Sequence, residues 1–241
     1  MTLEKAYELN EENKLPNGVT GIAVFDIDDT LVKANSSVIK IYKSVNGREI
    51  AISTAQFATD PDKEKMGKNV VYYNKTNEAP AEGIAFSIRE FRDPVKVYNS
   101  ITQGTPIIRN LRILDDKIKA GWDIAFLTAR GLQGTVAKAL RSYLKVRGSD
   151  GSLKPIGNQF KEALSAAVND EDIKYIGKDD GEKKANALRN IAKKYDRVAF
   201  IDDDMRNINA VRSSGIKTKA GENIRTIIAA KLTEKDLEDL K

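Results

Sequence analysis

The chain has no cysteine and no histidine among its 241 residues. Without cysteine there is no disulfide framework, no thiolate nucleophile and no cysteine-ligated zinc site. Without histidine, serine and cysteine triads of the usual kind are excluded as well. Any acid, base or nucleophilic chemistry must therefore come from carboxylates, from lysine or from a bound metal ion.

Long hydrophobic runs are missing too. No segment reaches the ~18 apolar residues of a membrane span, and the acidic N-terminal sequence, MTLEKAYELNEENKL, lacks the basic flank and apolar run of a secretory signal. We therefore expect a cytoplasmic protein that does not bind membranes. Glycine and proline, at 16 and 6 residues, are too few for a collagen-like or low-complexity chain.

What remains is an ordinary soluble composition, with 41% hydrophobic and 31% charged residues. The length suits one substantial domain with an insertion. Lysine and arginine number 40 and aspartate and glutamate 35, which gives a formal net charge of +5. This excess favours anionic partners, but it is small, and a solvated basic surface explains it more simply than a dedicated nucleic-acid interface does.

The stretch from Gly21 to Val32, GIAVFDIDDTLV, contains the densest group of chemically capable residues. Small and apolar residues lead directly into Asp26, Asp28 and Asp29, as in a buried parallel strand that ends in a carboxylate cluster. Two carboxylates one residue apart repel each other in a partly dry crevice. A divalent cation or a shared proton is therefore needed to hold both there.

Two later apolar segments end in polar residues in the same way. WDIAFL, residues 122–127, precedes Thr128, and RVAFI, residues 197–201, precedes the acids Asp202, Asp203 and Asp204. Strands that alternate with helices indicate a parallel α/β sheet, and their polar ends then lie along its carboxyl edge. The sequence thus predicts an α/β protein with one site at that edge.

Three other segments are predicted to begin or form helices. Thr105-Pro106 has the hydroxyl cap and first-position proline of a helix start, FKEALSAAV at 160–168 looks helical, and so do residues 224–232 near the end of the chain. The stretch around FKEALSAAV is otherwise hard to interpret, since its glycines are typical of a loop.

The segment between the first two strands has a different pattern. Alternating residues on both sides of Asn46-Gly47 predict a β-hairpin, since a type I′ turn needs positive φ at both central positions. The sequence from there to Tyr98 is irregular. We therefore expect a small β-rich cap at residues 38–98, inserted after the first strand into a core of residues 1–37 and 99–241.

Four motifs stand in order along the chain: DIDDT at 26–30, LTARG at 127–131, a lysine near the start of a helix at 182–195, and IDDDMRN at 201–207. Each alone is weak, because an Asp-x-Asp pair can belong to a calcium loop and successive acids can cap a helix. Together they resemble the haloacid dehalogenase (HAD) superfamily, and more loosely HAD-like proteins of tailed phages. The resemblance implies a doubly wound, Rossmann-like sheet and a Mg²⁺-dependent phosphatase.

The resemblance also implies a role for each motif. Asp26 would be the nucleophile that forms an aspartyl-phosphate, and Asp28 would protonate the leaving oxygen and later activate water. Mg²⁺ would bind a carboxylate oxygen of Asp26, the backbone carbonyl of Asp28 and the carboxylate of Asp203. Thr128 would hydrogen-bond a phosphoryl oxygen, and a lysine would offset the negative charge that develops there.

Two assignments stay open within this scheme. The direct metal ligand is one of Asp202, Asp203 and Asp204; Asp203 is favoured because family members usually use the second acid, with Asp202 or Asn207 in support. For the lysine we choose Lys184, since its spacing from Leu188 places it on the inward face of its helix. The lysines kept in reserve are Lys183, Lys178 and Lys154.

The predicted function is a Mg²⁺-dependent phosphomonoester hydrolase. Asp28 favours phosphoryl transfer over dehalogenation, because dehalogenases of the superfamily lack this second aspartate. A small cap would leave the site reachable, which favours a nucleotide or a nucleic-acid end over a fully enclosed metabolite. Two alternatives remain: a phosphotransferase or mutase of the same fold, and a non-catalytic HAD-like binding protein.

Overall fold

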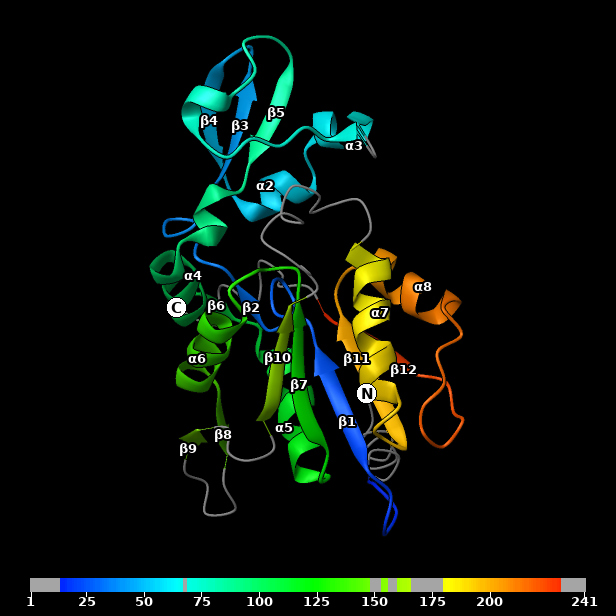
Figure 1. Ribbon diagram of the computed structural model, residues 1–241. Helices are drawn as coiled ribbons and strands as arrows, with labels where there is room; N and C mark the ends of the chain where they lie inside the picture. Colours follow the sequence, from blue (N-terminus) through cyan, green and yellow to red (C-terminus); the bar gives the residue numbers. More distant parts are fainter. Residues whose placement is uncertain (1–13, 67–68, 148–152, 156–159, 166–179, 231–241) are drawn as a thin grey trace.

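The computed structural model describes residues 14–66, 69–147, 153–155, 160–165 and 180–230 (Figure 1). Its centre is a sheet of five parallel strands in the order β10-β7-β1-β11-β12. These strands are β1 (Gly21–Phe25), β7 (Asp123–Thr128), β10 (Phe160–Ser165), β11 (Arg197–Asp202) and β12 (Arg225–Ile228). β1 lies in the middle of the sheet, and all five of its residues are buried.

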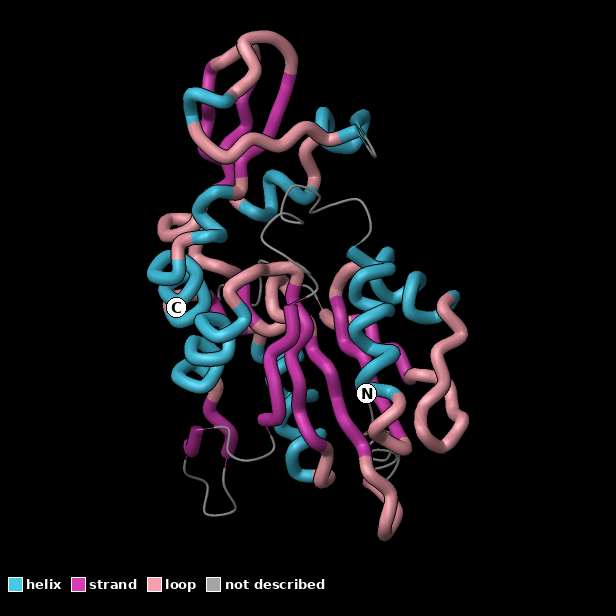
Figure 2. Tube along the Cα trace, viewed as in Figure 1, coloured by secondary structure: helices cyan, strands magenta, loops and turns pink. Residues whose placement is uncertain are grey.

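Helices cover both faces of this sheet (Figure 2). One face carries α4 (Pro94–Thr102), α5 (Ile108–Lys119) and α6 (Gln133–Tyr143), and the other carries α7 (Asp180–Ala192) and α8 (Met205–Ser213). Alternate residues of β1 point to opposite faces: Ala23 and Phe25 join the first cluster, and Ile22 and Val24 the second. The predicted doubly wound α/β fold is confirmed.

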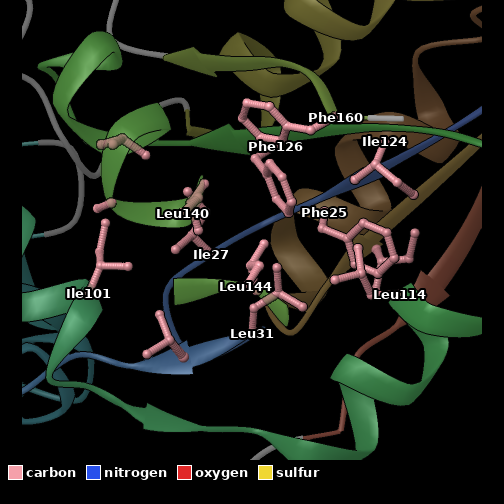
Figure 3. Packing of buried hydrophobic residues seen from close by; sticks show 14 of the residues in the cluster. Phe25, Ile27, Leu31, Ile101, Leu114, Ile124, Phe126, Leu140, Leu144 and Phe160 are labelled. Atoms are coloured by element: carbon pink, nitrogen blue, oxygen red, sulfur yellow. The ribbon is translucent and has the colours of Figure 1, made fainter. Parts of the chain in front are cut away.

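Aromatic rings from neighbouring strands lie in the hydrophobic cluster on one face of the core sheet (Figure 3). The ring centroids of Phe25 and Phe126 lie 6.4 Å apart, and those of Phe126 and Phe160 lie 5.2 Å apart. Leu114 of α5 and Leu140 of α6 pack against the same cluster. This packing holds β1 and β7 in place, and with them the residues that follow each strand.

A separate antiparallel sheet, in the order β4-β3-β5, forms the cap. Its strands are β3 (Ile41–Val45), β4 (Arg48–Ile52) and β5 (Ile84–Ser87). Asn46 and Gly47 have φ values of 49° and 78°, so the hairpin predicted from Asn-Gly is confirmed. Figure 1 shows the cap beyond the end of the core sheet toward which the strand arrows point. Its exact limits, 38–98, stay a prediction.

Short elements complete the described chain. In the cap these are α2 (Thr54–Ala58), α3 (Pro61–Met66), and the 3-10 helices η2 (Thr76–Glu78) and η3 (Arg89–Arg92). Two small antiparallel pairs join β2 (Val32–Lys33) to β6 (Thr105–Pro106) and β8 (Lys145–Arg147) to β9 (Leu153–Pro155). Among the helices described, none has the length and apolar content needed to cross a membrane.

The helix start predicted at Thr105-Pro106 is wrong. These two residues form β6, where Thr105 pairs with Lys33, and α5 begins three positions after Thr105, at Ile108. Proline lacks an N–H, yet a two-residue strand paired on one side tolerates it. The pairing with β2 therefore outweighs the local helix signal.

The helices predicted from FKEALSAAV and from residues 224–232 are also wrong over the described residues. FKEALS is β10, at the edge of the core sheet beside β7, and Arg225–Ile228 is β12 at the opposite edge. Helix propensity is a weak local preference, and each segment gains more by completing the sheet. Residues 166–168 and 231–232 lie outside the described part of the chain.

Candidate active site

The residues that follow β1 and β11 leave the core sheet side by side. Phe25 pairs with Ile201, and the backbone N–H of Asp26 donates to the Ile201 carbonyl at 2.8 Å. Asp26, Asp202 and Asp203 each present a carboxylate oxygen, and these three oxygens lie within 4.8 Å of one another. Asp26 and Asp202 are buried, and Asp203 is half-buried. The sheet register thus gathers acids from two distant motifs.

Lys184 of α7 reaches into this carboxylate group. Its Nζ donates to Asp26 Oδ1 at 2.6 Å and to Asp202 Oδ2 at 2.8 Å, and the residue is only 2% exposed. Burial beside Leu188 confirms the inward face predicted from their spacing. The neighbouring Lys183 is half-buried.

Of the other two reserve lysines, only Lys154 lies in the described part of the chain. Lys154 lies on β9, which Figure 1 places at the opposite end of the core from the cap. Lys178 lies outside the described residues. The assignment of the phosphate-binding lysine stays a prediction, and Lys184 is the candidate that the geometry supports.

The pKa values of Asp26 and Lys184 are shifted by this arrangement. Burial raises the pKa of Asp26 well above its usual range; Lys184 opposes this, while the charges of Asp202 and Asp28 add to it. Burial would lower the pKa of Lys184, but Asp26 and Asp202 more than offset it and hold that pKa above its ordinary value. Lys184 therefore stays charged, and its charge only partly offsets the effect of burial on the pKa of Asp26.

The three successive acids of the fourth motif have different hydrogen-bond partners. Asp202 Oδ1 accepts from the backbone N–H of Asp204 at 2.8 Å, and Asn207 Nδ2 donates to both oxygens at 3.2 and 3.0 Å. With Lys184 on Oδ2 as well, protein donors already engage both oxygens of Asp202. Asp202 is therefore better suited to positioning Lys184 and Asn207 than to binding a metal directly.

Asp203 and Asp204 face different surroundings. Asp203 Oδ1 accepts from the Thr30 hydroxyl at 3.0 Å, and its backbone N–H donates to the same hydroxyl oxygen at 3.1 Å. Asp204 caps α8, accepting from the Arg206 N–H at 2.8 Å and from the Arg206 guanidinium. The capping interpretation of this motif thus holds for Asp204, whereas Asp203 belongs to the carboxylate group with Asp26.

Asp28 and Thr128 are connected through Arg130, to which the sequence analysis assigned no role. Arg130 Nε and Nη2 donate to the two oxygens of Asp28 at 2.7 and 2.5 Å. The backbone N–H of Arg130 donates to the Thr128 hydroxyl at 3.1 Å. Thr128 is buried, because β7 ends directly beside β1. The position of Arg130 within the LTARG motif was the sequence feature that could have pointed to it.

Asn110 is a second residue that sequence reasoning missed. Its Nδ2 donates to the carbonyls of Thr30 at 2.6 Å and Ala230 at 2.7 Å, and its Oδ1 accepts from the Ala230 N–H at 3.0 Å. A buried amide that satisfies three backbone groups holds the loop after β1 against the segment after β12. Nothing in the pattern of α5 distinguishes Asn110 from an ordinary polar helix residue.

The donor set fits a hard divalent cation. Asp26, Asp202 and Asp203 bring three carboxyl groups to one place, and Lys184 donates to two of them, Asp26 and Asp202. Carboxylate oxygens are the ligands that Mg²⁺ prefers, and an uncompensated buried carboxylate is costly without a cation. Asp26 and Asp203 are the pair best placed to hold such an ion.

No family model matches the chain, and no curated protein matches it. Solved structures do. A HAD family enzyme from Bacteroides thetaiotaomicron, in a magnesium complex, is 11% identical with a TM-score of 0.41, and the match covers 93% of this chain and 100% of that one. A predicted HAD-like family hydrolase from Porphyromonas gingivalis is 12% identical with a TM-score of 0.42, covering 92% and 98%.

An Asp-to-Ala mutant of the Bacteroides thetaiotaomicron enzyme, in complex with magnesium and inorganic phosphate, also matches. It is 12% identical with a TM-score of 0.39, covering 90% of this chain and 97% of that one. Likenesses at this level decide nothing about what this chain binds or catalyses, so its function must be inferred from its own side chains. The likeness to phage proteins stays a prediction.

Proposed function

We propose that this protein is a Mg²⁺-dependent phosphomonoester hydrolase of the HAD type that acts through an aspartyl-phosphate on Asp26. The observation that supports this best is the meeting of Asp26, Lys184 and Asp203 at the carboxyl edge of the core sheet. These residues come from three of the four motifs that resemble the family. Their chemistry suits the transfer of a phosphoryl group to a carboxylate.

The metal requirement follows from the charges. Asp26 and Asp203 would hold Mg²⁺ through carboxylate oxygens, together with the backbone carbonyl of Asp28, while Asp202 keeps Lys184 in place. The ion would neutralise the phosphoryl oxygens of a bound substrate. Lys184, charged and buried beside Asp26, would share that work.

The protein side chains perform the bond changes. Asp26 forms a bond to phosphorus while the ester P–O bond breaks, and the departing oxygen takes a proton from Asp28. Water then attacks the aspartyl-phosphate and gives its proton to Asp28, which releases inorganic phosphate and regenerates both residues. The Thr128 hydroxyl accepts from the Arg130 N–H, so its own proton can be donated to a phosphoryl oxygen.

A nucleotide or a nucleic-acid terminal phosphate is the proposed substrate class. Support comes from the cap, whose sheet has three strands among the described residues, and from the Asp28 side chain, which is 30% exposed. A phosphorylated end of a large molecule could reach such a site without being enclosed. The small net positive charge of the chain agrees with an anionic substrate.

The test is hydrolysis of p-nitrophenyl phosphate with Mg²⁺, by wild type and by Asp26→Asn. We expect EDTA and the substitution each to abolish turnover. Asp29→Asn is the matched control, since it makes the same charge change in the same loop and Asn tolerates the φ of 58° found there. Full activity in Asp26→Asn would overturn the proposal.

A panel of nucleotides, sugar phosphates and 3′- or 5′-phosphorylated oligonucleotides then addresses the substrate. Higher kcat/KM for nucleotides or oligonucleotides supports the proposed class, and higher kcat/KM for sugar phosphates contradicts it. Transfer of the phosphoryl group to an added alcohol in preference to water indicates a phosphotransferase. Tight binding of a phosphorylated ligand without turnover indicates a binding protein.

A further inference from the structure

We propose that Arg130 is a positioning residue for the general acid Asp28, and that the segment returning from the cap to the core holds Arg130 in place. The inference rests on the proposed function, because it assigns Asp28 the proton transfer to the leaving group. It concerns a residue that touches Asp28 and not the reacting phosphorus.

The contact between the two side chains is a two-point clamp. Arg130 Nε lies 2.7 Å from Asp28 Oδ2, and Nη2 lies 2.5 Å from Oδ1. Paired N–H donors on a planar guanidinium fix both the distance and the plane of a carboxylate, which a single-point contact does not. The Asp28 side chain is 30% exposed and that of Arg130 only 2%. Arg130 therefore contacts Asp28 from the buried side, and Asp28 stays accessible from solvent.

Arg130 itself is held from the side away from Asp28. Its Nη1 donates to the Ser100 Oγ of α4 at 2.8 Å, and its guanidinium lies 5.1 Å from the ring centroid of Phe91 in η3. Ser100 is fully buried, and its hydroxyl donates to the Val97 carbonyl at 2.9 Å, which leaves an oxygen lone pair to accept from Arg130.

Phe91 and Ser100 lie on the segment that carries the chain from the cap strand β5 into the core helix α4. The clamp therefore joins three parts of the molecule: the loop after β1, the end of β7 and the return segment. A general acid works only when its proton lies within hydrogen-bond reach of the leaving oxygen. This role would account for a buried arginine that contacts a partly exposed carboxylate.

Direct binding of substrate phosphate by Arg130 is the competing role. All three nitrogens of the guanidinium already have described contacts, two with Asp28 and one with Ser100. The side chain of Arg130 is only 2% exposed, so it offers little surface to a phosphate, whereas the side chain of Asp28 is 30% exposed. The clamp requires no rearrangement.

The experiment compares two leaving groups. p-Nitrophenyl phosphate releases a weakly basic phenolate that needs little protonation, whereas glycerol 2-phosphate releases a basic alkoxide that depends on the acid. For Arg130→Gln we expect kcat/KM for glycerol 2-phosphate to fall by about 100-fold or more, and that for p-nitrophenyl phosphate by less than about 10-fold, since a positioned acid contributes 10²–10⁴-fold. Asp28→Asn should show the same selective loss.

Ser100→Ala provides a second, milder variant in case Arg130→Gln does not fold. It removes the support of the clamp and leaves the ion pair, so we expect a selective loss of the same kind but only severalfold. Equal losses on both substrates in these variants, or a rise in KM alone, would overturn the inference.

Failure of the inference can be told from failure of the proposed function. If Asp26→Asn is inactive and the two substrates respond equally to Arg130→Gln, only the inference is wrong. If Asp26→Asn is fully active, or the wild type hydrolyses neither substrate, the proposed function is wrong and the inference falls with it.

Discussion

Carboxylates in the cap and at the edge of the core sheet differ in the direction of their pKa shifts: those of Glu49 in the cap and Asp26 at the sheet edge are opposite. In the cap, Glu49 accepts from both terminal nitrogens of Arg89, at 2.7 and 3.0 Å, and from the hydroxyl of Tyr73 at 2.7 Å. Arg89 and Tyr73 hold the pKa of Glu49 below its usual value. The charges of Glu49 and Arg89 are thus paired with each other within the cap.

Glu90, at the junction of cap and core, is also surrounded by hydrogen-bond donors that lower its pKa. It accepts from the Lys96 ammonium, the Tyr42 hydroxyl and the Lys40 backbone N–H at 2.6 to 2.7 Å. Burial would raise the pKa of Glu90, but these donors outweigh it and lower the pKa. At the sheet edge, by contrast, Asp26 and Asp202 share the ammonium of Lys184, and burial raises the pKa of Asp26.

The number of carboxylates around one lysine does not by itself distinguish the cap from the sheet edge. In the cap, Lys43 also contacts two carboxylates, those of Asp60 and Asp62. The side chain of Asp62 is 31% exposed, and Asp60 accepts two backbone N–H bonds at the start of α3, which help to lower its pKa. Partial exposure of Asp62 and backbone donors to Asp60 thus accompany the lysine in that cluster. At Asp26, by contrast, the effect of burial outweighs that of Lys184 and the pKa stays raised, which is why the proposed Mg²⁺ site is placed at the sheet edge.

The largest effect should follow from removing the lysine of the sheet-edge group. Lys184→Met leaves Asp26 and Asp202 without their ammonium, and breaking a buried ion pair costs about 3–5 kcal/mol of unfolding free energy. We expect hydrolysis to fall by about 1000-fold and urea unfolding without Mg²⁺ to show this loss. The matched control is Lys183→Met, one position away and half-buried, which should change either quantity little. Equal behaviour of the two variants would contradict the assignment.

The next effect is stabilisation by the metal without substrate. If Asp26 and Asp203 bind Mg²⁺ in the folded state only, the ion at 100 times its dissociation constant adds about 2.7 kcal/mol to the unfolding free energy. Thermal unfolding with MgCl₂ and with EDTA measures this. Asp203→Asn should lose the response, and Asp204→Asn, which alters the α8 cap, should keep it. A response in Asp203→Asn equal to that of wild type would show that Asp203 is not a ligand.

A smaller effect is expected in the cap, where Arg89→Met removes the partner of Glu49. We expect a loss of about 1–2 kcal/mol at pH 7, since hydrogen bonds to charged groups contribute that much, with p-nitrophenyl phosphate hydrolysis unchanged. Because the pKa of Glu49 is lowered in the folded state, its stabilisation is present above the unfolded pKa of ~4.3 and is lost as the pH falls through the folded value.

The difference between wild type and Arg89→Met should therefore shrink below about pH 4, as urea unfolding at two pH values would show. Arg48→Met, exposed next to Glu49 on β4, is the control and should have little effect at either pH. A difference that stays constant down to pH 3 would mean that the ion pair is not its source.

The smallest effect concerns the hairpin turn. Gly47 has a φ of 78°, so Gly47→Ala is strained by about 1 kcal/mol, while its added methyl meets only Ala81 and Pro80 at 3.7 Å or more. Gly134→Ala in α6 should have the opposite sign, because that helical position has open space around it. Chemical unfolding of both variants checks the signs, and a stabilised Gly47→Ala would contradict the turn assignment.

The sequence by itself indicated several of the residues that the structure brings together at the edge of the core sheet. An apolar run of this length forms a buried strand, so GIAVFD places Asp26 directly after a strand of the core sheet. Helical spacing placed Lys184 inward with Leu188, and the φ requirement of Asn46-Gly47 predicted the hairpin. These are local rules, and they need no knowledge of distant residues.

Only the tertiary structure decided which side chains become partners. Arg130 meets Asp28 from 102 positions away, and Asn110 links Thr30 to Ala230 across 80 and 120 positions. FKEALS became a strand because the edge of β7 was there to pair with it. Local pattern sets the direction of a side chain. Its partner, and so the division of roles among Asp202, Asp203 and Asp204, depends on the packing of segments far apart in the chain.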